Sequence, residues 1–127
     1  MDLLIDTHVF LWWEASSPKM PPHVHAALAD PANAIFVSAA SVWEVAIKKR
    51  TGKLEFEGSV GLAVRRSGFE PLHIGLEDAE AAGGMVWSHT DPFDRLLVAQ
   101  SQRHGLTLAT ADFIIRDFAK VPLLWAG

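Results

Sequence analysis

Short apolar runs alternate along the chain with longer stretches in which apolar residues recur at helical spacing. Short runs between polar or turn-forming residues are typical of buried parallel strands, and the longer stretches are typical of amphipathic helices. The pattern predicts strands over residues 3–5, 35–37, 69–74, 106–110 and 121–125. It predicts helices over residues 9–15, 21–30, 38–49, 58–67, 76–87 and 92–104, and a short helix after Asp112.

The helix over 92–104 has the clearest end signals. Asp91 stands at its N-cap, Pro92 is its first residue and Gly105 follows its last. Two other elements carry residues that weaken them. Pro71 lies in the strand over 69–74, and the glycine pair at 83–84 lies in the second half of the helix over 76–87.

The alternation of strands and helices predicts an α/β fold, a three-layer α/β/α sandwich around a mostly parallel central sheet. With 127 residues, half of them hydrophobic and a fifth charged, the chain fits a single domain over residues 1–127. It has no cysteine, which excludes disulfides and thiolate metal sites. The first residues have no basic flank, and no apolar run approaches the roughly 18 residues of a membrane span, so we expect a cytoplasmic protein with no membrane contact.

Eleven basic and 15 acidic residues give a net charge of −4. This balance argues against a protein that holds nucleic acid by bulk positive charge. It does not argue against phosphate binding through metal ions, because the ions supply the missing charge.

Four acidic residues fall where the carboxyl ends of the predicted strands meet, which is where open parallel sheets carry their functional residues. Asp6 ends the first strand, and Asp112 comes two residues after the strand that ends at Thr110. Glu44 and Asp94 lie in the first turns of the helices that begin near residues 38 and 92. The predicted topology therefore brings four acids that are distant in sequence to one edge of the sheet.

Each acid also has a local explanation. Glu44 closes a capping-box pattern that begins at Ser41. Asp94 is favoured near a helix N-terminus by the helix dipole, and Asp112 suits the N-cap of the short helix after it. Asp6 is harder to explain locally, because a carboxylate against a strand of Leu and Ile is costly unless it is paired or bound to a cation.

Converging carboxylates repel one another, so one of them stays protonated unless a cation lies between them. Oxygen ligands without cysteine or histidine suit Mg²⁺ or Mn²⁺ rather than zinc. One such ion activates a water, and a second about 4 Å away stabilises the leaving oxygen of an in-line displacement. This is the chemistry of phosphodiester hydrolysis.

Four stretches of the chain, in this order, resemble the PIN-domain ribonucleases, and in particular the VapC toxins of bacterial and archaeal type II toxin–antitoxin pairs. Together they cover essentially the whole chain, and the third is the most specific. They are Asp6-Thr7-His8 with Leu11-Trp12-Trp13, Ser38-Ala39-Ala40-Ser41-Val42-Trp43-Glu44, Asp91-Pro92-Phe93-Asp94-Arg95-Leu96-Leu97-Val98-Ala99-Gln100, and Thr110-Ala111-Asp112.

The resemblance implies a Mg²⁺-dependent endoribonuclease, with Mn²⁺ as a substitute, that cuts cellular RNA and stops translation. Its catalytic and metal-binding acids are Asp6, Glu44, Asp94 and Asp112, with Thr110 as the small polar residue beside the last acid. We place Asp94 rather than Asp91 on the metal, because the family pattern has its third acid just before the Leu-Leu-Val-Ala run, and Asp91 then caps the helix. The resemblance also implies a homodimer held inactive by a small antitoxin protein.

Several other side chains are candidates for contact with substrate or partner. Arg95 follows the metal-binding turn and is placed to contact a phosphate, with Thr110 as a second candidate contact. The basic run over 48–50 either complements the helix dipole or binds RNA. The six histidines show no ligand spacing, although His8 and His89 lie near the predicted site. Some of the aromatic surface around Trp12 and Trp13 is available for a dimer or antitoxin contact.

Two other classes of protein place acids at strand ends. A phospho-receiver domain needs an acidic pair near the N-terminus and a lysine after a late strand, whereas Asp2 and Asp6 flank the first strand here and the last strand has no lysine. A non-catalytic α/β binding domain uses such acids only as helix caps. Binding of Mg²⁺ or Mn²⁺ distinguishes it from a nuclease, because a pure scaffold gains no stability from the ion.

Overall fold

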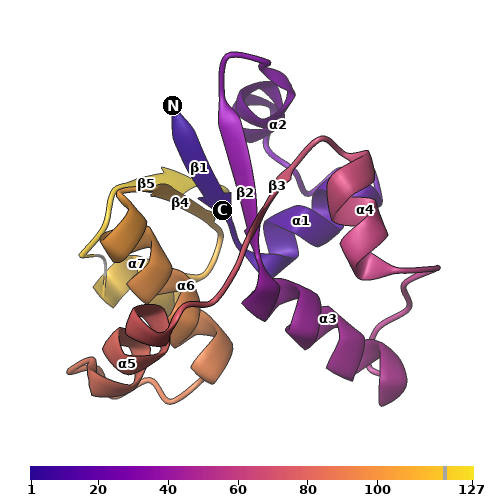
Figure 1. Cartoon of the computed structure of the whole chain (residues 1–127). Helices are drawn as coiled ribbons and strands as arrows, with labels where there is room; N and C mark the ends of the chain where they lie inside the picture. Colours follow the sequence, from indigo (N-terminus) through magenta and orange to yellow (C-terminus); the bar gives the residue numbers. More distant parts are fainter. Residues whose placement is uncertain (119) are drawn as a thin grey trace.

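Five parallel strands form one sheet in the computed structural model, which describes residues 1–118 and 120–127 (Figure 1). The strands are β1 (Asp2–Ile5), β2 (Ala34–Ser38), β3 (Glu70–Leu72), β4 (Thr107–Thr110) and β5 (Leu123–Trp125). Their order across the sheet is β3-β2-β1-β4-β5, and each of the four pairings is parallel. Pro71 is tolerated because β3 is an edge strand that pairs only with β2.

Seven helices connect the strands of the described chain. They are α1 (Thr7–Glu14), α2 (Pro22–Ala29), α3 (Ala39–Arg50), α4 (Val60–Arg66), α5 (Leu76–Gly84), α6 (Pro92–His104) and α7 (Phe113–Phe118). Every predicted element is present, with shifts at the ends. The helix predicted from residue 9 begins at Thr7, because Asp6 accepts a hydrogen bond from the Val9 amide and caps it. The helix predicted to reach residue 87 ends at Gly84, and Met85 is extended.

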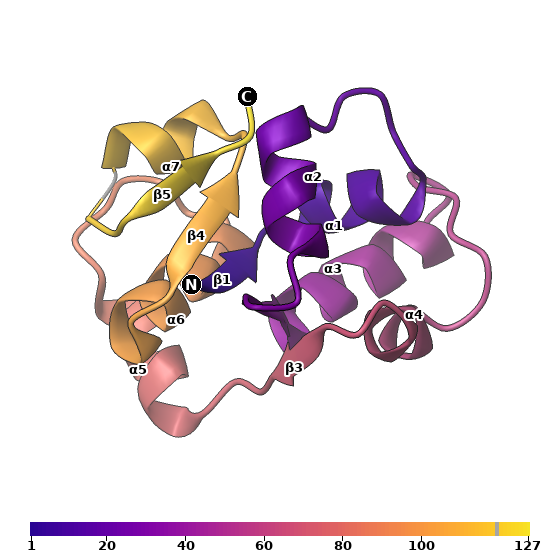
Figure 2. The same cartoon turned by 90° about the horizontal axis from the view of Figure 1, so that it is seen from above.

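The helices form two layers, one on each face of the sheet (Figures 1 and 2). Leu3 and Ile5 of β1 point to one face and pack with residues of α1, α2, α3 and α4. Leu4 points to the other face and packs with residues of α6 and α7, while α5 packs on α6. The predicted three-layer α/β/α sandwich is confirmed. No helix of the described residues has the length and apolar character needed to cross a membrane.

A chain of buried polar side chains ties α3, α5 and α6 together. The Ser38 hydroxyl, which caps α3, donates to the Gln100 carbonyl oxygen at 2.5 Å. The Gln100 amide in turn donates to a carboxylate oxygen of Asp78 at 3.3 Å. Asp78 is only 1% exposed and also accepts from Arg103 at 2.5 Å and from the Gly75 amide at 2.9 Å. The chain fixes the helix that carries Glu44 relative to the helix that carries Asp94.

These contacts also decide the protonation state of Asp78. Burial raises the pKa of its carboxyl, but the hydrogen bonds from Gly75, Arg103, Gln100 and His104 outweigh burial and lower the pKa to about 2. The folded pKa is below the ordinary value of 3.8, so the ionised carboxylate stabilises the fold at pH values above about 4. That stability is lost as the pH falls through about 2.

We expect Asp78→Asn to lower the free energy of unfolding at pH 7 by about 2 kcal/mol or more, because it leaves the Arg103 charge without its buried partner. The loss should shrink between pH 4 and pH 2.5, where the wild-type carboxylate begins to take up a proton. Urea unfolding at both ends of this range measures the effect. Glu77→Gln, at an exposed position of the same helix, is the matched control, and equal effects of the two substitutions would contradict the assignment.

Candidate functional site

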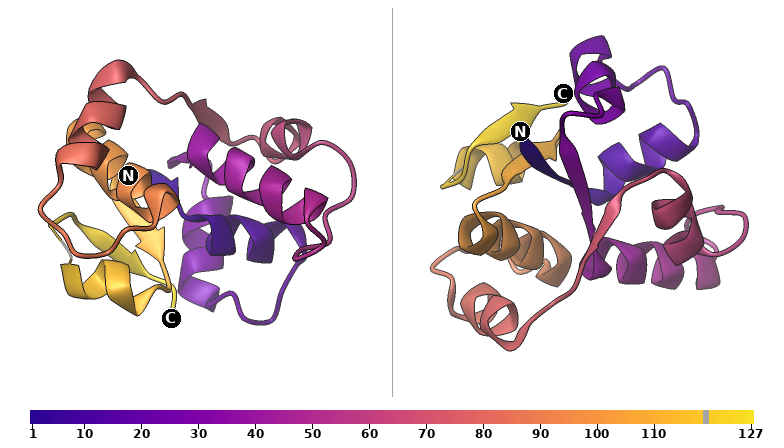
Figure 3. Two further views of the ribbon diagram at one scale, coloured as in Figure 1. Left: turned by 90° about the horizontal axis from the view of Figure 1, so that it is seen from below. Right: turned by 45° about the horizontal axis from the view of Figure 1, so that its top comes forward.

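The candidate site lies where the direction of chain progression across the sheet reverses. From β1 the chain builds β2 and β3 on one side, and β4 then pairs with the other side of β1. The carboxyl ends of β1 and β4 are thus at a topological switch point, the position where open α/β sheets bind ligands. Seen from the end of the molecule where β1 stops, α3 and α6 lie on either side of this point (Figure 3).

A small pocket of about 130 Å³ opens at this switch point. All four acids predicted from the sequence border it, so the structure brings them together, and Asp91 is a fifth acid in its wall. The full lining consists of Asp6, Thr7, His8, Glu44, Lys48, Asp91, Asp94, Leu97 and Asp112. A larger hollow of about 570 Å³ beside Trp12 and Trp13 has no acid in its lining, and one of about 300 Å³ is lined by Glu14, Glu55 and Glu57.

Asp6 is the most deeply buried acid of the pocket, at 4% exposed. Its two oxygens are both held: one accepts from the Val9 amide at 2.8 Å and the other from the Thr110 hydroxyl at 2.6 Å. Burial raises the pKa of the Asp6 carboxyl, and the nearby charge of Asp112 adds to this effect, while the two hydrogen bonds and His8 oppose it. The protein alone therefore keeps this carboxylate ionised only at a cost.

Thr110 links two of the acids and is itself fully buried. Its hydroxyl donates to Asp6 and accepts from the Asp112 amide at 3.0 Å. Asp112 also caps α7, since one of its oxygens accepts from the amide of Ile114 at 2.8 Å. The local explanation for Asp112 is thus present alongside its place in the pocket. Thr110 positions its neighbours and, being buried, is not placed to contact the substrate as predicted from the sequence.

Glu44 is held from two sides. The Thr7 hydroxyl donates to one of its oxygens at 2.6 Å, and the Lys48 ammonium donates to the other at 2.8 Å. The capping-box explanation is wrong, because α3 begins at Ala39 with Ser38 as its N-cap, which leaves Ser41 inside the helix. Thr7 lies in the first family-like stretch, but a threonine at a helix start carries no signal of a partner 37 residues away.

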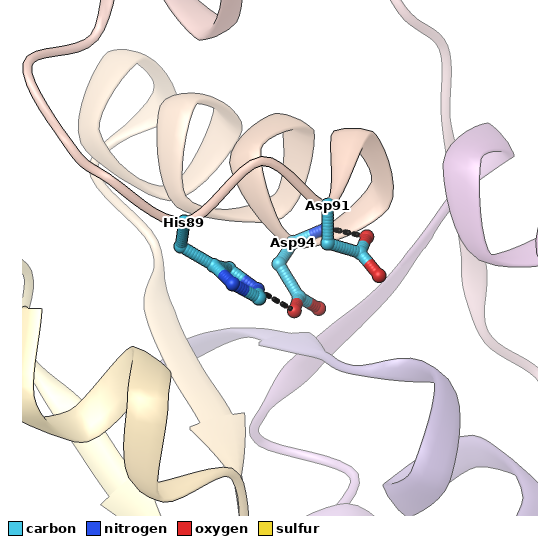
Figure 4. A group of neighbouring side chains, drawn as sticks. All are labelled: His89, Asp91 and Asp94. Atoms are coloured by element: carbon cyan, nitrogen blue, oxygen red, sulfur yellow. Dashed lines mark hydrogen bonds and ion pairs between the residues drawn. The ribbon is translucent and has the colours of Figure 1, made fainter.

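Asp94 forms a compact group with His89 and Asp91 (Figure 4). The His89 ring nitrogen Nε2 lies 2.6 Å from one oxygen of Asp94, and one potential ligand atom of each residue lies within 4.8 Å of the others. Of the four predicted acids this compact group includes only Asp94. Asp91 accepts hydrogen bonds from the Phe93 and Asp94 amides, so it caps α6 as predicted and also borders the pocket.

The environment of Asp94 disfavours its charge. Burial raises the pKa of the carboxyl to about 6, and the negative charges of Asp91 and Asp112 contribute, although the hydrogen bond from His89 opposes them. Two acids of one pocket thus have raised pKa values, mainly because they are buried and in smaller part because other carboxylates lie nearby. A helix-cap role alone does not require such crowding.

Arg95 has a different role from the phosphate contact predicted from the sequence. Its guanidinium donates to five carbonyl oxygens, two in the last turn of α5 (Ala82 and Gly83) and three in the segment between α5 and α6 (Met85, Trp87 and His89). All five N–H donors are used in this way, so we assign Arg95 to holding this segment instead. One of the carbonyls belongs to His89, at 3.0 Å, which places the ring of that residue beside Asp94.

The donor set of the pocket fits a hard divalent cation. Five of its lining residues offer carboxylate oxygens, which suit Mg²⁺ or Mn²⁺. The raised pKa values of Asp6 and Asp94 provide a driving force, because a cation between these groups relieves both burial and repulsion. His89, Asp91 and Asp94 bring potential ligand atoms within 4.8 Å of one another, and Asp6, Glu44 and Asp112 border the same pocket as the two aspartates.

Comparison with known proteins agrees with this geometry. The family model described as PIN domain matches residues 3–121. No curated protein matches the sequence. Among solved structures, the chain is similar to VapBC2 from Rickettsia felis bound to a DNA fragment from its promoter, with a TM-score of 0.70, 14% identity and 98% of each chain covered.

Two further structures are similar to the chain. One is a toxin–antitoxin complex from Klebsiella pneumoniae, with a TM-score of 0.64, 22% identity and 98% of each chain covered. The other is Mycobacterium tuberculosis VapC20, described as a toxin that cleaves the Sarcin-Ricin loop, with a TM-score of 0.55 and 16% identity over 87% of this chain and 88% of that chain. At these identities the similarity concerns the fold.

We expect Mg²⁺ or Mn²⁺ to raise the melting temperature at pH 7.5, by about 4 °C at ten times the dissociation constant. The rise should shrink as the pH falls from 7 to 5, because Asp94, with a pKa near 6, takes up a proton and no longer offers its charge to the ion. Differential scanning fluorimetry across this pH range tests the prediction. In Asp94→Asn the ion should bind more weakly, while Asp117→Asn, at an exposed position, should behave as wild type. A melting temperature insensitive to both ions at pH 7.5 would rule the site out.

Proposed function

The chain belongs to the PIN domain family, and from this membership we propose that it is a divalent-metal-dependent endoribonuclease of the VapC toxin type. The observation that carries the proposal is the pocket at the switch point, where acids from four separate segments of the chain meet. Such an arrangement suits the binding of metal ions at a phosphodiester bond.

The reaction we propose is hydrolysis of RNA that leaves a 3′-hydroxyl and a 5′-phosphate. A divalent cation, when bound, supplies a hydroxide nucleophile and neutralises charge on the phosphate. The chain contributes position: Val9 and Thr110 fix both oxygens of Asp6, and Thr7 fixes one oxygen of Glu44. Because these carboxylates are already held in position, they need to move little during the reaction.

The proposed substrate and partners rest on the similar structures. VapC20 is described as a toxin that cleaves the Sarcin-Ricin loop, and the other two similar structures are described as VapBC2 bound to promoter DNA and as a toxin–antitoxin complex. We propose by analogy that this protein cuts structured cellular RNA in the cytoplasm, acts as a homodimer and is inhibited by a cognate antitoxin. The alternative of a non-catalytic scaffold is disfavoured because burial, with a smaller effect of neighbouring carboxylates, raises the pKa values of Asp6 and Asp94, which helix caps alone do not require.

We expect Asp6→Asn and Asp94→Asn each to lower RNA cleavage by at least about 100-fold, because even residues that only orient metal ligands contribute 10–100-fold to metal binding. Purified protein is incubated with total cellular RNA and Mn²⁺ or Mg²⁺, and the cut ends are mapped by sequencing. EDTA should abolish cleavage by the wild type.

Asp117→Asn, purified in parallel, controls for contaminating nucleases and for the loss of one negative charge. Circular dichroism of each variant shows whether the fold is kept. Full cleavage by both pocket variants in the presence of metal would refute the proposed function.

A further inference from the structure

Lys48 is the one lysine or arginine among the described residues that line the acidic pocket. It lies one helical turn after Glu44 on α3, and its ammonium is 2.8 Å from the Glu44 oxygen that Thr7 does not hold. Its side chain is 41% exposed, so the ammonium reaches both the pocket and the solvent.

The ion pair with Glu44 contributes little to stability. The Glu44 carboxylate is buried, but the Lys48 side chain is 41% exposed, and solvent screening weakens the attraction between charges when one of them is partly exposed. Nor does Glu44 depend on Lys48 for its orientation, because the buried Thr7 hydroxyl holds the other oxygen at 2.6 Å. The presence of Lys48 in the lining of the acidic pocket is therefore not explained by stability or by the orientation of Glu44.

A lysine at the rim of an acidic pocket can contribute to the binding of RNA. The RNA backbone must bring negative phosphates up to five carboxylates, and Lys48 is a positive group with a long flexible stem at the rim. A divalent ion that binds near Glu44 repels the ammonium and competes with it for the same oxygen. The long stem of Lys48 would then let the displaced ammonium contact an RNA phosphate at the rim of the pocket.

Resting on the proposed function, we propose that Lys48 is a substrate-binding residue: it pairs with Glu44 in the metal-free protein and contacts an RNA phosphate when the metal site is loaded. Of the basic residues that end α3, Lys48-Lys49-Arg50, Lys48 alone borders the pocket. Lys49 itself points elsewhere, and its ammonium donates to the Gly58 carbonyl at 2.8 Å.

Lys48→Met distinguishes a substrate-binding role from a structural one, because loss of an RNA contact should lower kcat/KM without weakening the binding of Mn²⁺. Without RNA, Mn²⁺ measured by titration calorimetry should bind as tightly as in the wild type or more tightly, since a competing positive charge is gone. With RNA, kcat/KM at saturating Mn²⁺ should fall by about 10-fold or more, as expected for the loss of a charged hydrogen bond.

The salt dependence provides a second readout. Each phosphate contact to a single strand contributes about −0.7 to the slope of log affinity against log salt, so the slope of log kcat/KM should become shallower by about 0.7 in Lys48→Met. Lys48→Arg should keep most of the activity and the slope. Lys49→Met removes the same charge from the neighbouring residue outside the pocket and should leave both unchanged.

Weaker Mn²⁺ binding in Lys48→Met, or a salt slope equal to that of the wild type, would overturn the inference and leave Lys48 as a partner of Glu44 only. Equal losses in Lys48→Met and Lys49→Met would also overturn it, because they would show an effect of net charge. A wild-type protein that does not cleave RNA would instead refute the proposed function itself.

Discussion

Repulsion among carboxylates crowded at one edge of the sheet is the constraint on which the rest of the structure depends. A parallel sheet with helices on both faces brings the ends of its strands together, and the chain places an acid at or near several of these ends. Burial and mutual repulsion raise the pKa of Asp6 and of Asp94, so the ionised pocket is costly for the protein by itself. The rest of the fold has to hold these groups together against that cost.

The protein meets this demand with neutral donors and with helix ends. Backbone amides and hydroxyl groups hold Asp6 and Glu44, and the caps of α6 and α7 hold Asp91 and Asp112. The buried chain from Ser38 through Gln100 to Asp78 then fixes α3 against α6, which face each other across the pocket. Two basic side chains that contact the acids directly, Lys48 and His89, are partly exposed. Positive charge is thus available without filling the space between the carboxylates.

The sequence predicted most of the fold, because the apolar runs and the caps are local signals. Asp91 and Gly105 define the ends of α6 where they were expected, and the convergence of Asp6, Glu44, Asp94 and Asp112 followed from the parallel topology. What could not be predicted depends on contacts between distant segments. Neither the bond from Thr7 to Glu44 nor the five carbonyls around Arg95 has a sequence pattern, and Arg95 was therefore assigned to phosphate. Local patterns also failed at Gly84, where the glycine pair ends α5 before residue 87.

The arrangement around Arg95 has a consequence for how the segment between α5 and α6 can vary. The planar Arg95 guanidinium donates hydrogen bonds to backbone carbonyls that would otherwise need partners in a helix or a strand. This stretch therefore keeps a defined path without regular secondary structure. The backbone path of this stretch does not depend on the Val86 side chain, which is 96% exposed. Amino-acid changes at exposed positions such as Val86 should be tolerated, whereas Met85 and Trp87 pack against the core. Lysine cannot replace Arg95, because three donors on a single nitrogen cannot reach carbonyls spread around a five-donor fork.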